Sequence, residues 1–513
     1  MSQVPTEPPP PPSVGSAVAG DAAKIAGGSA IVMAGGVGER GLRLFLNWVL
    51  ARFLGPEAFG VYSFVQTMVT TLVSLSALGT DGGIVYFGAR YRKAGEQGRL
   101  KGTLLSCLAI AVAAGLVFTA GLWLLGRTWT VGPDRQAAVS ALTIGALSVL
   151  FGSVQAVLVG GLVAAKDMRG QALVGQLGLP ALTLCTAVLA LWLDMGVNGA
   201  LWAMAVAYGL SMVHGAHLFW RRFGPLLRDR LIPVQTETGS LLRYSIPQSL
   251  ARSLYQANMR IDILMLTAMA TLTDVGVYKI ATMIAQLGAL PVMASTTMFG
   301  PVVSELVYSR EQARLGALLR VVTRWLIIVS APAYIVLVLL PDVVLSVFDP
   351  LYATGGRALA ILMLGQAAYV ACAPSGALVT MGGNSGTNLM NGLVSVGLNA
   401  ALNALLIPRM GMEGAALASA IALTFWSLLR VIEARWLQGC WAFDRRVAWV
   451  LVAAMLCGGG ASLVSQDASI LTRLMVVGLA VLVFLGAVAL AGRTEEDELV
   501  LGRVRARLAR GRR

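Results

Sequence analysis

The sequence predicts an all-α polytopic membrane protein with fourteen transmembrane helices, on the grounds of its composition, its long apolar segments and its charge distribution. Of its 513 residues, 57% are hydrophobic and only 12% are charged, and the mean hydropathy is +0.75. A soluble domain carries about 25% charged residues, which it needs to cover its surface. This chain cannot cover a water-facing surface, so most of it must contact lipid.

The apolar segments give the predicted spans. Each is long enough to cross about 30 Å of hydrocarbon as a helix, and Gly, Pro, Asp or clustered Arg separates one from the next. The fourteen predicted spans are 25–53, 58–88, 102–126, 136–164, 172–193, 198–219, 240–270, 275–307, 315–340, 357–381, 388–407, 413–436, 447–465 and 470–491.

The cations divide unevenly between the two sides of this layout. With a cytoplasmic N-terminus, the cytoplasmic connections hold 20 Lys and Arg residues and the outer connections hold six. Positive residues concentrate in cytoplasmic loops, so we expect both termini in the cytoplasm. The tail from Arg493 adds seven cations, which the anionic lipids of the inner leaflet attract. Most of the net charge of +14 therefore sets topology, and no nucleic-acid partner is expected.

A sequence repeat with a nearly constant offset relates the two halves of the chain. Gly60-Val61-Tyr62 recurs as Gly276-Val277-Tyr278, Arg99-Leu100 as Arg314-Leu315, and Gly170 with Leu173 as Gly386 with Leu389. Met195-Gly196-x-x-Gly199-Ala200 recurs as Met410-Gly411-x-x-Gly414-Ala415. An even number of helices in each copy gives both copies the same orientation, and two such lobes place a substrate cleft between them.

The predicted domains follow from the spans and the repeat. They are a disordered, proline-rich cytoplasmic tail, an N-terminal lobe of six helices, a C-terminal lobe of six helices, two appended helices and a basic cytoplasmic tail. Their boundaries are 1–23, 24–225, 235–440, 441–492 and 493–513.

Charged residues inside spans are costly and are candidates for function. The first, seventh and eighth helices carry a surplus of cations, and Arg binds phosphate through paired hydrogen bonds, so the cleft is expected to bind an anion. Glu39 and Arg43 are four residues apart and are expected to pair. The candidate cleft residues are Arg40, Arg43, Arg252, Arg260, Lys279 and Gln256 for substrate, with Glu39, Asp81 and Asp262 for an ion.

No catalytic residue, metal site or cofactor is predicted. The five cysteines show no CxxC spacing, and His214 and His217 lack further ligands near them. Gly35-Gly36-Val37-Gly38 and Gly382-Gly383-Asn384-Ser385-Gly386 are not followed by the lysine of a phosphate loop. A glycan polymerase or ligase, the alternative from another class, would need a long outer loop bearing an acidic or Arg cluster.

Several motifs resemble the lipid-linked oligosaccharide flippases of the MOP superfamily, and most closely the Wzx-type polysaccharide exporters. The resemblance covers nearly all of residues 24–440. The motifs are Leu54-Gly55-Pro56-Glu57-Ala58-Phe59-Gly60-Val61-Tyr62, Leu78-Gly79-Thr80-Asp81, Ala89-Arg90-Tyr91-Arg92, Tyr244-Ser245-Ile246-Pro247, Asp274-Val275-Gly276-Val277-Tyr278 and Gly411-Met412-Glu413-Gly414-Ala415-Ala416.

The resemblance implies a V-shaped fold of two six-helix lobes plus two helices, in a bacterial cytoplasmic membrane. It implies alternating access that moves an undecaprenyl-diphosphate-linked oligosaccharide from the inner to the outer leaflet for surface polysaccharide or lipopolysaccharide synthesis. Proton or sodium coupling, contact with membrane lipid, and partnership with the polymerase and glycosyltransferases of the pathway belong to the same expectation. Lipid II flippases and MATE-like drug exporters of the superfamily remain alternatives, and the glycan, the coupling ion and the oligomeric state stay open.

Overall fold

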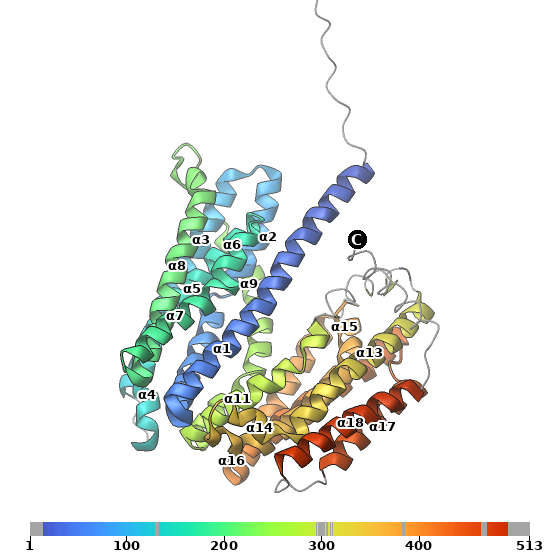
Figure 1. The fold of residues 1–513 in the computed structure, drawn as a ribbon. Coiled ribbons are helices and arrows are strands. Elements are labelled where there is room, and N and C mark those ends of the chain that lie inside the picture. The colour runs from blue at the N-terminus through green and yellow to red at the C-terminus, as the bar shows by residue number, and fades with distance from the viewer. Residues whose placement is uncertain are drawn as a thin grey trace, which may run out of the picture.

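All regular secondary structure in the described residues is helical (Figure 1). The structure is a computed structural model that describes residues 14–128, 133–293, 295, 303, 306–307, 309, 311–381, 385–462 and 469–490. Side chains of residues 14–35, 251–255 and a few others within helices are not described.

The elements of the first half lie between residues 14 and 228. They are α1 (Val14–Ser76), α2 (Thr80–Ala94), α3 (Gln97–Thr128), α4 (Pro133–Gly145), α5 (Leu147–Ala164), α6 (Met168–Gln171), the π-helix η1 (Ala172–Gln176), α7 (Gly178–Trp192) and α8 (Gly196–Arg228).

The elements of the second half begin after a linker of residues 229–237. They are α9 (Thr238–Asn258), α10 (Ile261–Met269), α11 (Leu272–Leu287), α13 (Gln312–Leu339), α14 (Pro341–Ser346), the 3₁₀-helix η2 (Pro350–Gly355), α15 (Gly356–Met381), α16 (Ser385–Gln438), α17 (Arg445–Ser462) and α18 (Ile470–Leu490).

Nine helical segments of the described chain are long and apolar enough to cross a membrane, which confirms a multi-pass membrane protein. Two of them, Gly38–Ala94 and Met390–Gln438, run for 57 and 49 residues, and each covers two predicted spans. The predicted spans 240–270, 275–307 and 447–465 have no counterpart among the nine. The first of these is broken, because α9 ends at Asn258 and α10 has only nine residues. The number fourteen stays a prediction.

The N-terminal boundary needs a correction. The sequence predicts a disordered tail over residues 1–23, but α1 begins at Val14, directly after the proline run. Residues 14–23 contain no proline and are rich in Ala, the residue with the highest helix propensity, so the helix extends toward the N-terminus. Residues 1–13 and the predicted basic tail from 493 lie outside the described residues.

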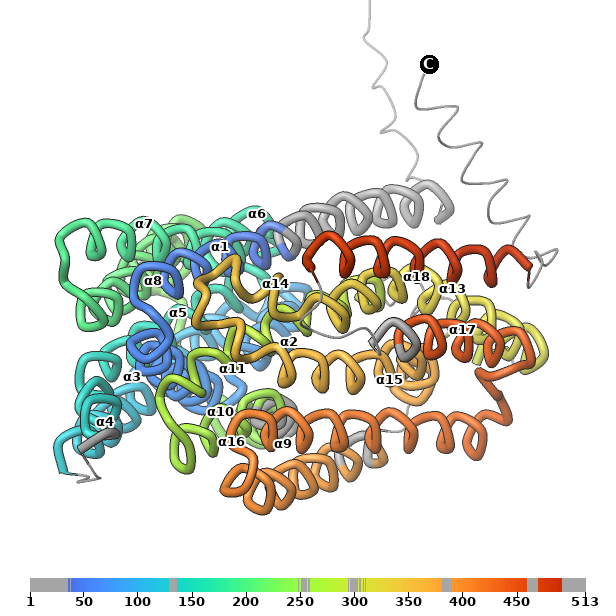
Figure 2. Tube along the Cα trace, turned by 60° about the horizontal axis from the view of Figure 1, so that its bottom comes forward, coloured from blue at the N-terminus to red at the C-terminus, as the bar shows by residue number. Residues whose placement is uncertain are grey.

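The helices form two groups that meet at one end and diverge at the other (Figure 1). α2 to α8 lie in one group and α11 to α18 in the other, while α1 runs along the junction. Figure 2 shows from another direction that α3, α4, α7 and α8 lie on one side and α13, α17 and α18 on the other. α9 departs from this order. The Cβ that Gly79 (just before α2) or Gly83 of α2 lacks would meet Ser245 of α9, and the Tyr86 and Tyr244 rings stack at 4.5 Å, so α9 packs on the first group, while it also contacts α16 of the second.

The sequence repeat has structural counterparts. Gly196 and Gly411 adopt φ of 57° and 55°, values that L side chains rarely adopt, at the turn before the last helix of each predicted lobe. Arg99 and Arg314, also equivalent in the repeat, form ion pairs with Glu96 and Glu311 at 2.9 and 3.3 Å. The equivalent residues therefore share these local features. The boundaries of the two six-helix lobes stay a prediction.

The two groups meet where the Gly-Val-Tyr copies touch. A Cβ on Gly60 would lie 1.9 Å from the carbonyl oxygen of Leu272, and one on Gly276 would lie 2.0 Å from that of Pro56. Tyr62 and Tyr278, two residues beyond these glycines, are fully buried in the core that joins the groups. Only glycine permits this approach of the two backbones.

Candidate functional site

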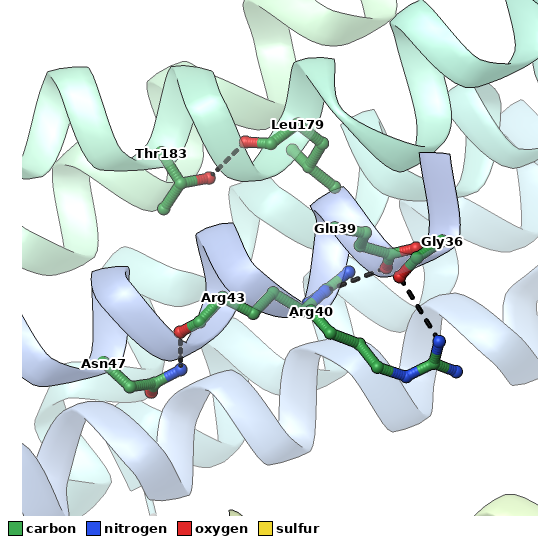
Figure 3. Close-up of polar contacts among 7 residues, drawn as sticks. All are labelled: Gly36, Glu39, Arg40, Arg43, Asn47, Leu179 and Thr183. Carbon is green, nitrogen blue, oxygen red and sulfur yellow. Dashed lines mark hydrogen bonds and ion pairs between the residues drawn. The ribbon is translucent and has the colours of Figure 1, made fainter. Parts of the chain in front are cut away.

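The polar residues in the middle of α1 are mostly satisfied within the helix. Arg43 Nε donates to Glu39 Oε1 at 2.9 Å, which confirms the predicted pair, and Asn47 Nδ2 donates to the Arg43 carbonyl at 2.6 Å. Arg40 extends away from this pair, and its Nη1 donates to the Gly36 carbonyl at 3.3 Å (Figure 3). Arg40 therefore has a neutral acceptor, whereas the charge of Arg43 is partly balanced.

Arg260 and Lys279 join Arg43 at the junction of the two groups. Arg260 precedes α10, at the break that separates it from α9, and Lys279 lies one helical turn after Gly276 on α11. The three side chains are close enough that Arg43 acts electrostatically on both Arg260 and Lys279, and Arg260 acts on Lys279. We name these three residues the cation cluster. Its members come from α1, from the start of α10 and from α11, and so from both halves of the chain.

The cation cluster has little opposite charge beside it in the described chain. The Arg260 Nη1 atom is buried and has no hydrogen-bond partner there. Glu39 pairs with Arg43, and Asp262 is close enough to act electrostatically on Lys279. Because a buried unsatisfied donor costs about 1–3 kcal/mol and more when charged, this arrangement favours an anionic ligand.

Asp262 is buried and held by three donors. The Tyr278 hydroxyl donates to its Oδ2 at 2.6 Å, the Ser419 hydroxyl donates to the same atom at 3.1 Å, and the Ile263 N–H donates to Oδ1 at 2.9 Å. These contacts tie α10 to α11 and α16. Asp262 is therefore both an acid beside the cluster and a packing element of the second group.

The other predicted site residues lie elsewhere or are not described. Asp81 is near the start of α2, where its carboxylate acts electrostatically on Cys107 of α3 and its carbonyl lies against Gly160 of α5. Gln256 is half-buried near the end of α9. The side chain of Arg252 lies outside the described residues.

The structure adds side chains that the sequence did not single out. Tyr208 of α8 is buried and lies within electrostatic range of both Arg43 and Arg260. Tyr278 and Ser419 bind Asp262 from 16 and 157 positions away. Tyr278 belongs to the repeated Gly-Val-Tyr motif, which could have marked it as a candidate in the sequence. Ser419 lies in an apolar helix, and no sequence pattern distinguishes it. No group of three or more His, Cys, Asp or Glu residues placed to hold a metal occurs in the described chain.

The helix arrangement is shared with membrane transporters of known structure. The lipid II flippase MurJ in an inward closed conformation has a TM-score of 0.67 at 15% identity, covering 89% of this chain and 97% of its own. An inward-facing multidrug resistance MATE family transporter of the MOP superfamily has a TM-score of 0.64 at 16% identity, covering 78% and 94%. A MOP superfamily transporter from Pyrococcus furiosus, described with a binding pocket of reverse polarity, has a TM-score of 0.56 at 16% identity, covering 80% and 96%. The chain is thus a membrane protein with the MOP transporter fold.

The sequence places the chain more narrowly. Residues 25–307 match the polysaccharide biosynthesis protein family, and this match covers more than half of the chain. The protein belongs to that family. No curated protein sequence matches it.

Proposed function

We propose that the protein flips an undecaprenyl-diphosphate-linked oligosaccharide from the inner to the outer leaflet of a bacterial cytoplasmic membrane. Both termini are cytoplasmic in this proposal, and the protein acts with the polymerase and glycosyltransferases of a surface polysaccharide pathway. Membership of the polysaccharide biosynthesis protein family and the MOP fold support it.

The cation cluster is the observation that carries the proposal. A diphosphate offers several anionic oxygens, and Arg43, Arg260 and Lys279 offer three cationic groups at the place where the two helix groups join. Lys279 lies only one turn from Gly276, so the bound diphosphate would sit beside the contact that holds the groups together. The lipid chains would remain in the bilayer while the groups rock about this contact.

The test replaces the cations singly in cells that depend on this protein for surface polysaccharide. Arg260→Gln and Lys279→Gln should each lower the rate of export roughly 10- to 100-fold, because each removes a charge-assisted hydrogen bond worth about 1.5–3 kcal/mol. Arg314→Gln is the matched control, since Arg314 is 73% exposed in an ion pair with Glu311. Wild-type export by both cluster variants at normal expression would refute the proposal.

A lipid II flippase is the second candidate, favoured by the similarity to MurJ over 97% of that chain. Both substrates carry a lipid-linked diphosphate, so the cation cluster does not separate them. The two candidates can be separated by expressing this protein in cells depleted of their own lipid II flippase and measuring growth. Rescue by this protein, with surface polysaccharide unchanged in its absence, would establish the second candidate in place of the first.

For the return step we propose Asp262 as the group that carries a coupling proton or sodium ion. Asp262 is the acid that acts electrostatically on Lys279. The hydroxyl oxygens of Tyr278 and Ser419 lie beside its carboxylate. Asp262→Asn keeps the shape of the side chain, and its amide oxygen can still accept from Tyr278 and Ser419, although the bond from the Ile263 N–H to the second oxygen is lost. Its transport should no longer depend on the ion gradient, while Asp81→Asn should leave that dependence unchanged. A gradient dependence preserved in Asp262→Asn would exclude this role.

A further inference from the structure

A pocket of about 270 Å³ lies far from the cation cluster along the helices, at the ends of α2, α3, α5 and α8. Arg92, Arg222, Tyr91 and Gln97 supply its polar atoms, and Leu100, Ala165, Phe223 and Leu226 supply apolar surface. On the topology predicted from the charge distribution, this end of the helices lies at the cytoplasmic membrane surface. The pocket is therefore at the level where lipid headgroups lie.

The chain around the pocket is strongly basic. Segments 90–101, 166–169 and 221–237 contain eleven Lys and Arg residues against four Asp and Glu residues. Most of the acids are engaged: Glu96 and Glu237 with Arg99, and Asp167 with Arg222. Arg92 is exposed and forms no ion pair within the part of the chain that the structure describes. Its charge is available to a ligand.

Arg222 is held in place at the rim. Its Nε and Nη2 donate to Asp167 Oδ2 at 3.0 and 2.8 Å, and the Gly170 N–H donates to Asp167 Oδ1 at 2.9 Å. Burial opposes the ionisation of Asp167, but these hydrogen bonds outweigh it and lower the pKa of the carboxyl. Asp167 therefore stays ionised and fixes the guanidinium, whose Nη1 remains for another acceptor.

We propose that this pocket binds the phosphate of an anionic membrane lipid, with Arg92 and Arg222 on the phosphate and Leu100, Phe223 and Leu226 against the glycerol and upper acyl chain. Arg matches the geometry of phosphate oxygens, and basic pockets between helices on the cytoplasmic side suit such headgroups. The apolar floor distinguishes a lipid from free phosphate, which would gain nothing from it.

A lipid bound in the pocket would affect the position of α9 through Tyr91. The Tyr91 ring lines the pocket, and its hydroxyl donates to Glu237 Oε2 at 2.6 Å. Glu237 is the last residue before α9, the helix that crosses from one group to the other. A bound headgroup would thus stabilise the anchor of α9 without touching the cation cluster.

The test measures lipid binding and does not depend on transport. Phosphatidylglycerol is titrated into the purified full-length protein in a detergent–phosphatidylcholine mixture, and bound lipid is counted by native mass spectrometry. Lys93→Gln is the control, because it removes the same charge from the same helix at an exposed residue that does not line the pocket. General surface attraction predicts a loss of at most about fivefold in affinity for that variant.

Arg92→Gln should lower the affinity for phosphatidylglycerol at least about 20-fold, since it also removes direct hydrogen bonds to the phosphate. Ala165→Leu keeps every charge and fills the pocket, so it should lose affinity to a similar degree, with Ala165→Val in its place if the leucine lowers the melting temperature. Equal losses in Arg92→Gln and Lys93→Gln, or wild-type affinity in the filled-pocket variant, would overturn the proposal. Displacement of the lipid by an equal concentration of inorganic phosphate would identify free phosphate as the ligand and overturn the lipid assignment.

Discussion

Gly60 and Gly276 lie against each other's helices at the junction of the two groups, although they belong to opposite halves of the chain. The Cβ that Gly60 lacks would lie 1.9 Å from the Leu272 carbonyl oxygen, and that of Gly276 would lie 2.0 Å from the Pro56 carbonyl oxygen and 3.1 Å from the Gly60 nitrogen. Pro56 and Leu272 are separated along the chain by the same interval as the two glycines. The contact is therefore reciprocal, as expected for two copies of one repeat that meet across a pseudo-twofold axis.

Gly60→Ala and Gly276→Ala should each destabilise the protein. The added methyl meets backbone atoms that can yield only if the helices separate, so we expect the free energy of unfolding to fall by about 1–3 kcal/mol. Thermal unfolding in detergent measures this. Gly478→Ala on α18 is the control, because its Cβ would meet no atom within 4 Å. Equal stability of all three variants would mean that the helices pack less closely than described.

A second set of contacts fastens α1 to residues 347–352 near the same end. Arg52 Nη1 pairs with Asp349 Oδ2 at 2.9 Å, Trp48 Nε1 donates to the Val347 carbonyl at 3.1 Å, and the Tyr352 hydroxyl donates to the Ala51 carbonyl at 3.3 Å. These bonds must break if this end opens during transport.

Linking Arg52→Cys to Asp349→Cys with a short bifunctional thiol reagent should therefore stop export and leave the fold intact. The exposed Cys185 is replaced by serine in this background. The control pair is Glu96→Cys with Arg99→Cys, whose side chains contact each other at the start of α3 within one group. Export at the control rate after complete cross-linking of the first pair would show that this end stays closed.

The linker of residues 229–237 is bound to the start of α3. Lys101 Nζ donates to the Asp229 carbonyl at 2.7 Å, and a Cβ on Gly102 would lie 2.0 Å from the Gln235 carbonyl oxygen. Gly102→Ala should displace the linker and raise the rate of tryptic cleavage at Arg228 and Arg230 by roughly tenfold, since proteolysis follows local opening.

The control for the linker is Gly239→Ala, two residues beyond it, where a Cβ would meet no atom within 4 Å. Its cleavage rate should match that of the wild type. Faster cleavage in both variants, or in neither, would contradict the close contact between Gly102 and the linker.

Arg473 of α18 binds Asp342 of α14, with Nη1 2.7 Å from Oδ2 and Nη2 2.5 Å from Oδ1. The Arg473 side chain is 9% exposed, so Arg473→Met should lower the free energy of unfolding by about 1–3 kcal/mol. Arg314→Met, in an exposed pair, should change it by less than about 1 kcal/mol. A loss no larger than that of the exposed pair would show that α18 is held by apolar packing alone.

The same pair predicts a dependence on pH. The hydrogen bond from Arg473 lowers the pKa of Asp342 more than burial raises it. A carboxyl with a lowered folded pKa adds stability that is present above its unfolded pKa, about 3.9, and is lost as the pH falls through the folded value. The difference in melting temperature between wild type and Asp342→Asn should therefore shrink below about pH 4. A difference that stays constant from pH 7 to pH 3 would contradict the lowered pKa.

Local interactions could be predicted from the sequence because they depend on spacing along one helix. Glu39 and Arg43 pair as their separation of four residues indicates, and the copies of the repeat recur as nearly equal φ values at Gly196 and Gly411. Breaks inside long apolar segments could not be predicted in this way. α1 passes into α2 through a turn at residues 77–79, and α9 ends at Asn258, although hydropathy runs across both places.

The sequence by itself determined the membrane environment, the repeat, the family and the presence of cations on the first, seventh and eighth predicted spans, because each is a property of composition or of order along the chain. The tertiary structure decided which of those cations influence one another: Arg43, Arg260 and Lys279 lie within electrostatic range of one another, whereas Arg40 donates to a carbonyl of its own helix. It also decided that Tyr278 and Ser419 hold Asp262. The physical reason is that a helix's preference for the membrane depends on its own sequence. Which face of the helix is buried, and which helix packs against that face, depend instead on contacts between segments from opposite halves of the chain.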